Sequence, residues 1–173
     1  MLYPDFYYDS IFHIPYKSLY EQGLRGLVYD IDNTLAGYED RQPPARILSL
    51  ISELHEIGFQ VGLLSNNHSG RLNTFNKTMK LPGASLAAKP FTSALKRVMR
   101  EMHVEQHETA IVGDQLLADI WCGKRAGITT ILVKPMTERE VITVILKRLP
   151  EQWLLKRYLR SRTNPSKPPA KQL

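Results

Sequence analysis

Early in the sequence the chain reads Gly26-Leu27-Val28-Tyr29-Asp30-Ile31-Asp32-Asn33-Thr34-Leu35, an apolar run closed by two acids. Such a run predicts a buried strand that delivers Asp30 and Asp32 to its C-terminal end. In open α/β sheets, that end of the strand is where ligands bind. Two carboxylates held this close repel each other. Their position therefore predicts a divalent cation, or a nucleophile paired with an acid/base group.

Strands and helices alternate along the rest of the chain. Apolar runs predict strands at residues 24–31, 59–64, 84–88, 109–112 and 128–133. Helical spacing and helix-end signals predict helices at residues 43–57, 69–79, 91–102, 116–126, 137–148 and 151–160. This order predicts an α/β fold, with a single Rossmann-like core, a parallel sheet of about five strands and helices on both faces.

We expect three segments. Residues 1–23 are rich in aromatic side chains and interrupted by prolines. They predict irregular structure that wraps the core, with one helical turn near residues 16–21. Residues 24–160 are predicted to form the core with its C-terminal helices. Residues 161–173 are rich in proline and carry basic side chains, which predicts a disordered basic tail.

Composition narrows the class of protein. A chain of 173 residues with 43% hydrophobic and 23% charged residues is typical of one globular domain. No apolar stretch reaches the roughly 18 residues that suggest a transmembrane helix, and the start lacks a signal-peptide pattern. The single Cys122 excludes an internal disulfide framework and is expected to be a small buried hydrophobe. We therefore expect a cytoplasmic protein.

The net charge of +6 is concentrated near the C-terminus. After Glu151 the charged residues are all basic: Lys156, Arg157, Arg160, Arg162, Lys167 and Lys171. Such a tail would suit nucleic acid, a ribosome or an anionic membrane, and would then make the protein peripheral at that membrane. A solvated helix end followed by a frayed terminus explains the same charges, and both interpretations stay open.

Polar residues follow the other predicted strands as well. They are Ser65, Asn66 and Asn67 after the second strand, Lys89 after the third, and Gly113, Asp114 and Gln115 after the fourth, with Asp119 in the next helix. Each alone is an ordinary turn former, solvated charge or helix cap. Right-handed crossovers, however, bring all these strand ends to one edge of the sheet.

Together these groups predict a site for a phosphate with a metal ion. Asp30, Asp32 and Asp114 offer the hard oxygen ligands that suit Mg²⁺. Ser65 and its neighbours offer hydrogen-bond donors near a helix N-terminus, and Lys89 offers a positive charge for phosphate oxygens. The chain has no glycine-rich loop of the ATP-binding type.

This arrangement resembles the haloacid dehalogenase (HAD) superfamily of phosphohydrolases. The four motifs of that family match, in order, Asp30-Ile31-Asp32-Asn33-Thr34, Ser65, Lys89 and Gly113-Asp114-Gln115-Leu116-Leu117-Ala118-Asp119. Three further details resemble the YqeG-like group of subfamily IIIA: the Asp-x-Asp-Asn-Thr form, the Asn after Ser65, and Pro4-Asp5 with Ser10-Ile11.

The resemblance implies a role for each residue. Asp30 would be the nucleophile that becomes an aspartyl-phosphate, and Asp32 the acid/base. Ser65, Asn66 and Lys89 would bind the phosphate. Mg²⁺ would be held by Asp30, Asp114 and the backbone carbonyl of Asp32, supported by Asn33, Thr34, Gly113 and Asp119.

The spacing of the motifs predicts an uncapped site. Cap domains of the family are inserted between the first and second motifs or between the second and third. Here residues 35–64 and 66–88 are each used up by one helix and one strand, whereas a separate domain needs roughly 50 residues or more. Only residues 36–42 would act as a local flap. An open site favours a bulky phosphorylated substrate, and the subunit of a homo-oligomer would be one source of a lid.

Two alternatives accompany the phosphatase hypothesis. Related subfamily IIIA enzymes include phosphatidylglycerophosphate phosphatases, so a lipid phosphatase at a membrane surface is the first. The second, motivated by the basic tail, is an RNA- or ribosome-binding module with a quiet phosphate site, although the chain carries no recognised RNA motif.

Overall fold

The computed structural model describes residues 2–136. The helices predicted at residues 137–148 and 151–160 and the tail at 161–173 lie outside the described residues. The strands are β1 (Phe6–Tyr8), β2 (Gly26–Tyr29), β3 (Gln60–Leu64), β4 (Gly83–Ala84), β5 (Thr109–Gly113) and β6 (Thr129–Val133). The α-helices are α1 (Tyr16–Glu21), α2 (Ala45–Ile57), α3 (Ser69–Asn76), α4 (Ser93–Glu101) and α5 (Trp121–Ala126). Two short 3₁₀ turns, η1 (Ile11–His13) and η2 (Gln106–Glu108), and a π-helical segment, η3 (Leu116–Ile120), complete the described elements.

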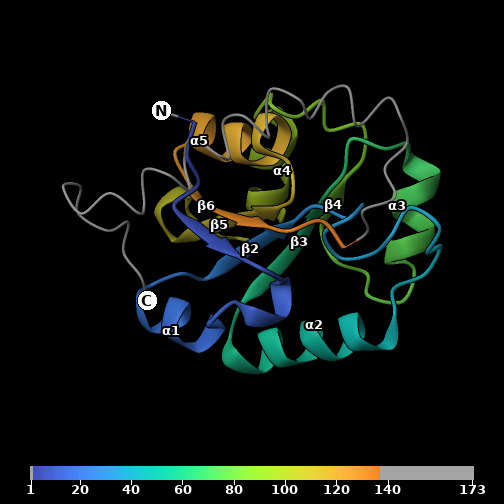
Figure 1. Cartoon of the computed structure of the whole chain (residues 1–173), viewed down its shortest axis with the longest axis horizontal. Coiled ribbons are helices and arrows are strands. Elements are labelled where there is room, and N and C mark those ends of the chain that lie inside the picture. The colour runs from blue at the N-terminus through green and yellow to red at the C-terminus, as the bar shows by residue number, and fades with distance from the viewer. Residues whose placement is uncertain (1, 137–173) are drawn as a thin grey trace.

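The strands form one parallel sheet in the order β1-β6-β5-β2-β3-β4. Figure 1 shows α1 and α2 on one face of this sheet and α4 and α5 on the other. The predicted α/β architecture is confirmed, and within residues 2–136 the links from β2 to β3 and from β3 to β4 hold no inserted domain. β2 lies between β5 and β3, so the acids that follow it stand near the middle of the sheet.

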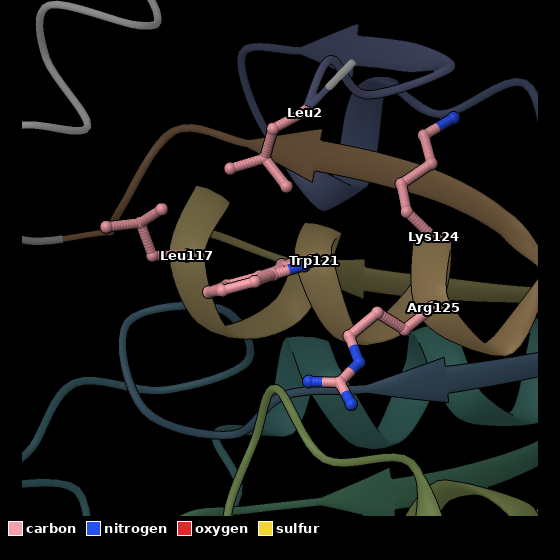
Figure 2. A pocket seen from close by; sticks show the side chains of 5 residues that line it. All are labelled: Leu2, Leu117, Trp121, Lys124 and Arg125. Carbon is pink, nitrogen blue, oxygen red and sulfur yellow. The ribbon is translucent and has the colours of Figure 1, made fainter.

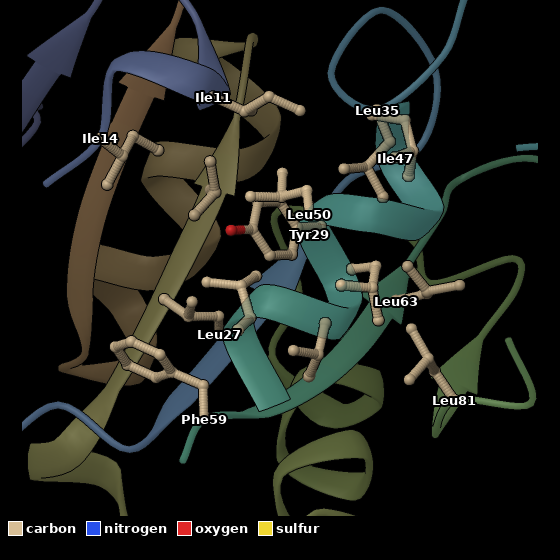
Figure 3. Packing of buried hydrophobic residues seen from close by; sticks show 14 of the residues in the cluster. Ile11, Ile14, Leu27, Tyr29, Leu35, Ile47, Leu50, Phe59, Leu63 and Leu81 are labelled. Atoms are coloured by element: carbon tan, nitrogen blue, oxygen red, sulfur yellow. The ribbon is translucent and has the colours of Figure 1, made fainter. Parts of the chain in front are cut away.

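A hydrophobic core fills each face of the sheet. Side chains of β2 and β3 pack with α1 and α2 on one face, and Figure 3 shows this cluster around Tyr29 and Leu63. The Tyr29 hydroxyl is fully buried and donates to the Tyr16 hydroxyl at 2.9 Å, which in turn donates to the carbonyl of Ile11 at 2.7 Å. Because its buried hydroxyl is paired in this way, Tyr16 of the N-terminal segment forms part of the core, whereas Phe12 is exposed.

The sheet has a sixth strand where irregular structure was expected. β1 pairs with β6 at the edge of the sheet, and Asp5 fixes its start: the carboxylate accepts from the backbone of Thr130 at 2.9 Å and from Lys124 at 2.5 Å. A three-residue edge strand is too short to show a periodic pattern, which is why the sequence did not indicate it. The helical turn predicted near residues 16–21 is confirmed as α1. The segment boundaries at residues 23 and 160 stay predictions.

The helix predicted at residues 116–126 begins in π-helical geometry. Ile120 N donates to the carbonyl of Gln115 at 3.2 Å, five residues back, before α5 continues and ends at Gly127 in the left-handed conformation. Short π segments inside helices are frequent at functional sites. Here the widened turn carries Asp119 at the carboxyl edge of the sheet.

Candidate active site

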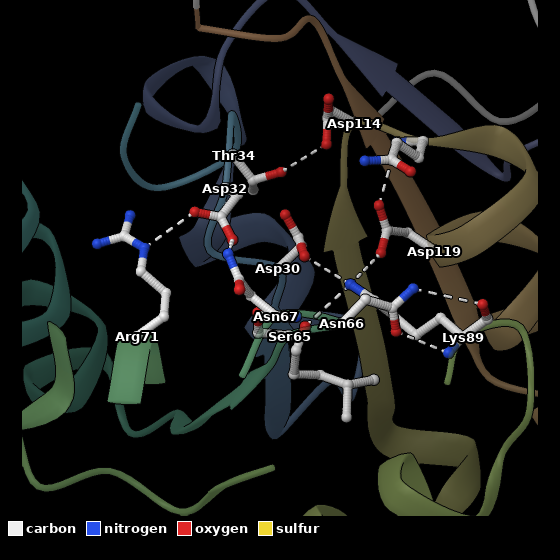
Figure 4. Close-up of polar contacts among 12 residues, drawn as sticks. Asp30, Asp32, Thr34, Ser65, Asn66, Asn67, Arg71, Lys89, Asp114 and Asp119 are labelled. Carbon is white, nitrogen blue, oxygen red and sulfur yellow. Dashed lines mark hydrogen bonds and ion pairs between the residues drawn. The ribbon is translucent and has the colours of Figure 1, made fainter. Parts of the chain in front are cut away.

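Three strand ends bring four of the predicted polar residues together, as Figure 4 shows. Asp30 and Asp32 follow β2, Ser65 follows β3, and Asp114 follows β5. All four are buried, although three of them are acids. Burying unpaired carboxylates is costly, so the groups that surround them determine what the site can do.

Lys89 is the positive centre of this cluster. Its Nζ donates to Asp30 Oδ1 at 2.5 Å, to Asp119 Oδ1 at 2.7 Å and to the carbonyl of Leu64 at 2.9 Å. All three ammonium protons are therefore used. Burial opposes the charge, but the carboxylates of Asp119 and Asp30 outweigh it and raise the pKa of Lys89 above its ordinary value. The lysine therefore stays protonated throughout the physiological range.

Lys89 offsets the negative charge of the Asp30 carboxylate only in part. Burial, opposed by Lys89 and reinforced by the charges of Asp119 and Asp114, raises its pKa well above the ordinary value for aspartate. Its Oδ1 accepts from Lys89, while its Oδ2 is buried without a hydrogen-bond partner in the described part of the chain. One lysine thus faces three acids, and one carboxylate oxygen is left to bind a ligand.

The arrangement fits a divalent cation. Carboxylate oxygens of Asp30, Asp114 and Asp119 lie within 4.8 Å of one another, and all three residues are buried. Hard oxygen donors at this spacing match the preference of Mg²⁺, and a dication would offset the excess negative charge. Asp119 already accepts from Lys89 and, through Oδ2, from the backbone of Gln115 at 3.1 Å. Asp30 and Asp114 are therefore better placed than Asp119 to be direct ligands.

The supporting residues shape the backbone around these acids. Asn33 is buried with a φ of 65°, a left-handed conformation that asparagine tolerates, and its N–H donates to the carbonyl of Ala36 at 2.7 Å. Thr34 Oγ1 donates to Asp114 Oδ1 at 3.3 Å. Gly113 leaves room for Asp119, because a Cβ atom at residue 113 would lie 2.3 Å from the Asp119 carboxylate.

After β3, Asn66 holds the backbone of Lys89, and Asn66 and Asn67, but not Ser65, line the pocket. Asn66 Oδ1 accepts from the backbone N–H of Lys89 at 2.8 Å, and its Nδ2 donates to the carbonyl of Lys89 at 3.4 Å. Ser65 Oγ accepts from the backbone of Asn67 at 3.0 Å. Both side chains of the amide pair Asn66 and Asn67 line a pocket of about 260 Å³, together with Asp30, Asp32, Tyr38, Lys89 and Gln115.

Asp32 is set apart from the other acids. Its carboxylate is absent from the metal-sized cluster and instead accepts from Arg71 Nε at 3.0 Å and from Asn67 Nδ2 at 3.5 Å. Arg71 and Tyr38 were not among the site residues predicted from the sequence, although Tyr38 lies in the predicted flap at residues 36–42. An arginine in a helix and a tyrosine in a loop carry no motif, and the contacts of Arg71 join segments more than thirty residues apart. Only the folded chain shows them beside the acids.

A parallel sheet with aspartates and a lysine at its carboxyl edge suits the binding of a phosphate together with a cation, and comparisons with known proteins identify the class of protein. A family model described as HAD-hydrolase-like matches residues 86–140. "Probable phosphatase YqeG" of Bacillus subtilis is 32% identical over 152 residues, 88% of each chain. A solved structure of an uncharacterised protein from Listeria monocytogenes serotype 4b, 14% identical, has the same fold with a TM-score of 0.52, covering 78% of this chain and 99% of that one.

A chloroplastic phosphatidylglycerophosphate phosphatase 1 of Chlamydomonas reinhardtii is 30% identical over 163 residues, 84% of this chain and 58% of that protein. The chain belongs to the YqeG-like phosphatases of the HAD superfamily. The expectation of an enzyme that hydrolyses phosphoric monoesters is confirmed at that level.

Proposed function

We propose that the protein is a Mg²⁺-dependent phosphohydrolase that cleaves phosphate monoesters through an aspartyl-phosphate on Asp30. The observation that carries the proposal is the state of Asp30, a buried carboxylate with one oxygen on Lys89 and the other without a hydrogen-bond partner among residues 2–136. A nucleophile needs a free oxygen held in place by its neighbour.

The reaction has two steps, transfer of the phosphoryl group to Asp30 and hydrolysis of the aspartyl-phosphate. An Asp30 oxygen bonds to phosphorus while the bond from phosphorus to the leaving oxygen breaks and Asp32 gives that oxygen its proton. Asp32 then takes a proton from water, whose oxygen bonds to phosphorus and releases phosphate and the Asp30 carboxylate. Ser65 would donate to the phosphate oxygens, the charge of Lys89 would attract them, and Asn66 fixes the backbone of Lys89.

The metal would be held by Asp30, Asp114 and the backbone carbonyl of Asp32, with Asn33, Thr34, Gly113 and Asp119 supporting them. When bound, Mg²⁺ would supply positive charge against that of the phosphate and the clustered carboxylates. The distinct surroundings of Asp30 and Asp32, one on Lys89 and the other on Arg71, support different roles for the two acids.

Phosphate release from an aryl phosphate in the presence of Mg²⁺ tests this function. The wild type should release phosphate and Asp30→Asn should not. Arg97→Gln, at an exposed position on α4, should release phosphate at the wild-type rate. Equal rates for wild type and Asp30→Asn would remove Asp30 as the nucleophile. Isothermal titration with Mg²⁺ tests the metal separately, since Asp114→Asn should weaken binding whether or not a substrate is known.

A lipid phosphate is the second candidate substrate. Leu86, Phe91 and Trp121 are among the exposed large apolar side chains, and the first two flank Lys89 in the chain. A groove of about 420 Å³ lies beside Trp121, with Leu2, Leu117, Lys124 and Arg125 around it, as Figure 2 shows. Apolar and cationic groups side by side suit an anionic lipid. The similarity to a phosphatidylglycerophosphate phosphatase supports the same substrate class.

A dispersion of phosphatidylglycerophosphate, compared with soluble sugar and nucleotide phosphates, separates the two substrate classes. A lipid enzyme should prefer the dispersion and lose that preference in Phe91→Ser/Trp121→Ser, with aryl phosphate turnover retained. No helix within residues 2–136 is long and apolar enough to span a bilayer. Under this proposal the protein acts in the cytoplasm, at the surface of a membrane.

A further inference from the structure

The guanidinium of Arg71 donates to three acceptors beside the pocket. Arg71 lies in α3, outside every motif, and its side chain is 9% exposed. Nε donates to Asp32 Oδ1 at 3.0 Å, Nη2 donates to the carbonyl of Gly37 at 3.1 Å, and Nη1 donates to the carbonyl of Asp40. The guanidinium carbon lies 5.2 Å from the ring centroid of buried Phe75, which supports the arginine from behind.

The two carbonyls belong to one tight turn. The Gly37 N–H donates to Asp40 Oδ2 at 2.9 Å, and the Asp40 N–H donates to the carbonyl of Gly37 at 3.2 Å. Tyr38 lies inside this turn, is 37% exposed and lines the pocket. The turn therefore places an aromatic side chain at the mouth of the pocket, on the segment that directly follows the acids.

We propose that Arg71 builds the leaving-group side of the site, because one guanidinium orients the carboxylate of Asp32 and at the same time fixes the Gly37–Asp40 turn that presents Tyr38. The inference rests on the proposed function, in which Asp32 protonates the leaving oxygen. Whatever lies beside Asp32 then lies beside the leaving group. Arg71 is a positioning residue, and Tyr38 is the side chain that meets the group attached to the phosphate.

The geometry requires an arginine. A planar fork donates in three fixed directions, to one carboxylate and two carbonyls, whereas an ammonium on a flexible stem would keep the charge but lose the fixed directions. A buried ion pair alone contributes little net stability. Arg71 also donates to the carbonyls of Gly37 and Asp40, which an ion pair with Asp32 alone would not require. These bonds link the position of Asp32 to that of Tyr38.

The dependence of the rate on the leaving group tests the inference. The value of kcat/KM reports the phosphoryl-transfer step, in which phenolate or an alkoxide needs a proton and 4-nitrophenolate scarcely does. Arg71→Gln should lower kcat/KM for phenyl phosphate at least about tenfold more than for 4-nitrophenyl phosphate, since general acid catalysis contributes about 10²–10⁴-fold. Arg97→Gln should change neither value. An equal loss on both substrates would overturn the orienting role.

Amide hydrogen exchange gives a readout that needs no activity. Arg71→Gln should speed exchange in the peptide that covers residues 37–42 and leave α4 unchanged, and Arg71→Lys should behave like Arg71→Gln. If residues 37–42 exchanged as slowly in Arg71→Lys as in the wild type, a positive charge alone would hold the turn. That result would overturn the requirement for a planar guanidinium. Unchanged exchange in Arg71→Gln would overturn the clamp on the turn. Wild type inactive on every phosphate ester would remove the proposed function, while the exchange result would still decide the clamp.

Discussion

Lys89 Nζ lies 2.5 Å from Asp30 Oδ1, so the proposed nucleophile and the main cation of the site share one buried hydrogen bond. Lys89 also donates to Asp119, and the second oxygen of Asp30 has no hydrogen-bond partner within residues 2–136. The pair thus links the stability of the fold with the chemistry of the site.

Removal of the lysine should destabilise the protein. In Lys89→Met, the carboxylates of Asp30 and Asp119 lose their buried partner, and we expect the free energy of unfolding without metal to fall by about 3–5 kcal/mol. Urea denaturation in a chelating buffer measures it. Lys89→Met/Asp119→Asn should recover part of the loss, since one uncompensated charge is gone. A double variant as unstable as Lys89→Met would contradict this account of Lys89.

Metal should stabilise the wild type through the same acids. We expect saturating Mg²⁺ to raise the melting temperature, with about 2.7 kcal/mol gained at a hundredfold excess over the dissociation constant. Asp114→Asn should lose most of the rise, whereas Asp9→Asn, at an exposed ion pair with Lys134, should keep it. A rise that persists in Asp114→Asn would place the metal elsewhere.

Asp30 makes the metal-free protein sensitive to pH. Its pKa is raised above the unfolded value, chiefly by burial. At a pH between the unfolded and the folded pKa, the folded state therefore holds a proton that the unfolded state has lost. Stability should therefore be highest below the unfolded pKa, about 3.9, and fall as the pH rises toward the folded pKa, as far as this group contributes. The contribution of Asp30 is isolated by comparing the free energies of unfolding of wild type and Asp30→Asn, measured by denaturation at several pH values. The variant should gain about 1 kcal/mol at neutral pH without metal, and a loss there would contradict the argument.

Cys122 should be unreactive in the native protein. Burial raises the pKa of its thiol to about 11, and its Sγ lies 3.3 Å from the carbonyl of Phe91. At pH 8.5 we expect alkylation to be at least about tenfold slower than in urea, because the thiolate is the reactive form. Cys122→Ala should keep full phosphatase activity. Rapid native alkylation with loss of activity would give the thiol a role that the structure does not support.

The core strands and the acids could be predicted because their signals are local. The apolar run Gly26–Tyr29 and the acids that follow it indicate both a buried strand and its polar end. The helix after Pro43-Pro44 likewise follows from end signals, and it runs from Ala45 to Ile57. Because all strands are parallel, these local signals were sufficient to place the polar residues on one edge.

The missed features depend on contacts between distant segments. β1 exists because Asp5 and β6 hold three residues at an open sheet edge, and nothing within Phe6–Tyr8 alone requires a strand. Arg71 belongs to the site only because α3 packs beside the Gly37–Asp40 turn. The π-helical start of the helix after β5 carries Asp119, whose partner Lys89 comes from another segment.

Rapid acid quenching and peptide mass spectrometry test the central claim most directly. Asp32→Asn, mixed with 4-nitrophenyl phosphate and Mg²⁺, should still form the phosphoenzyme because this leaving group scarcely needs a proton, but hydrolyse it slowly because water lacks its base. The account predicts one phosphoryl group on the peptide that contains Asp30, and none in Asp30→Asn/Asp32→Asn. A phosphoryl group on another residue, or turnover by Asp30→Asn at the wild-type rate, would contradict it.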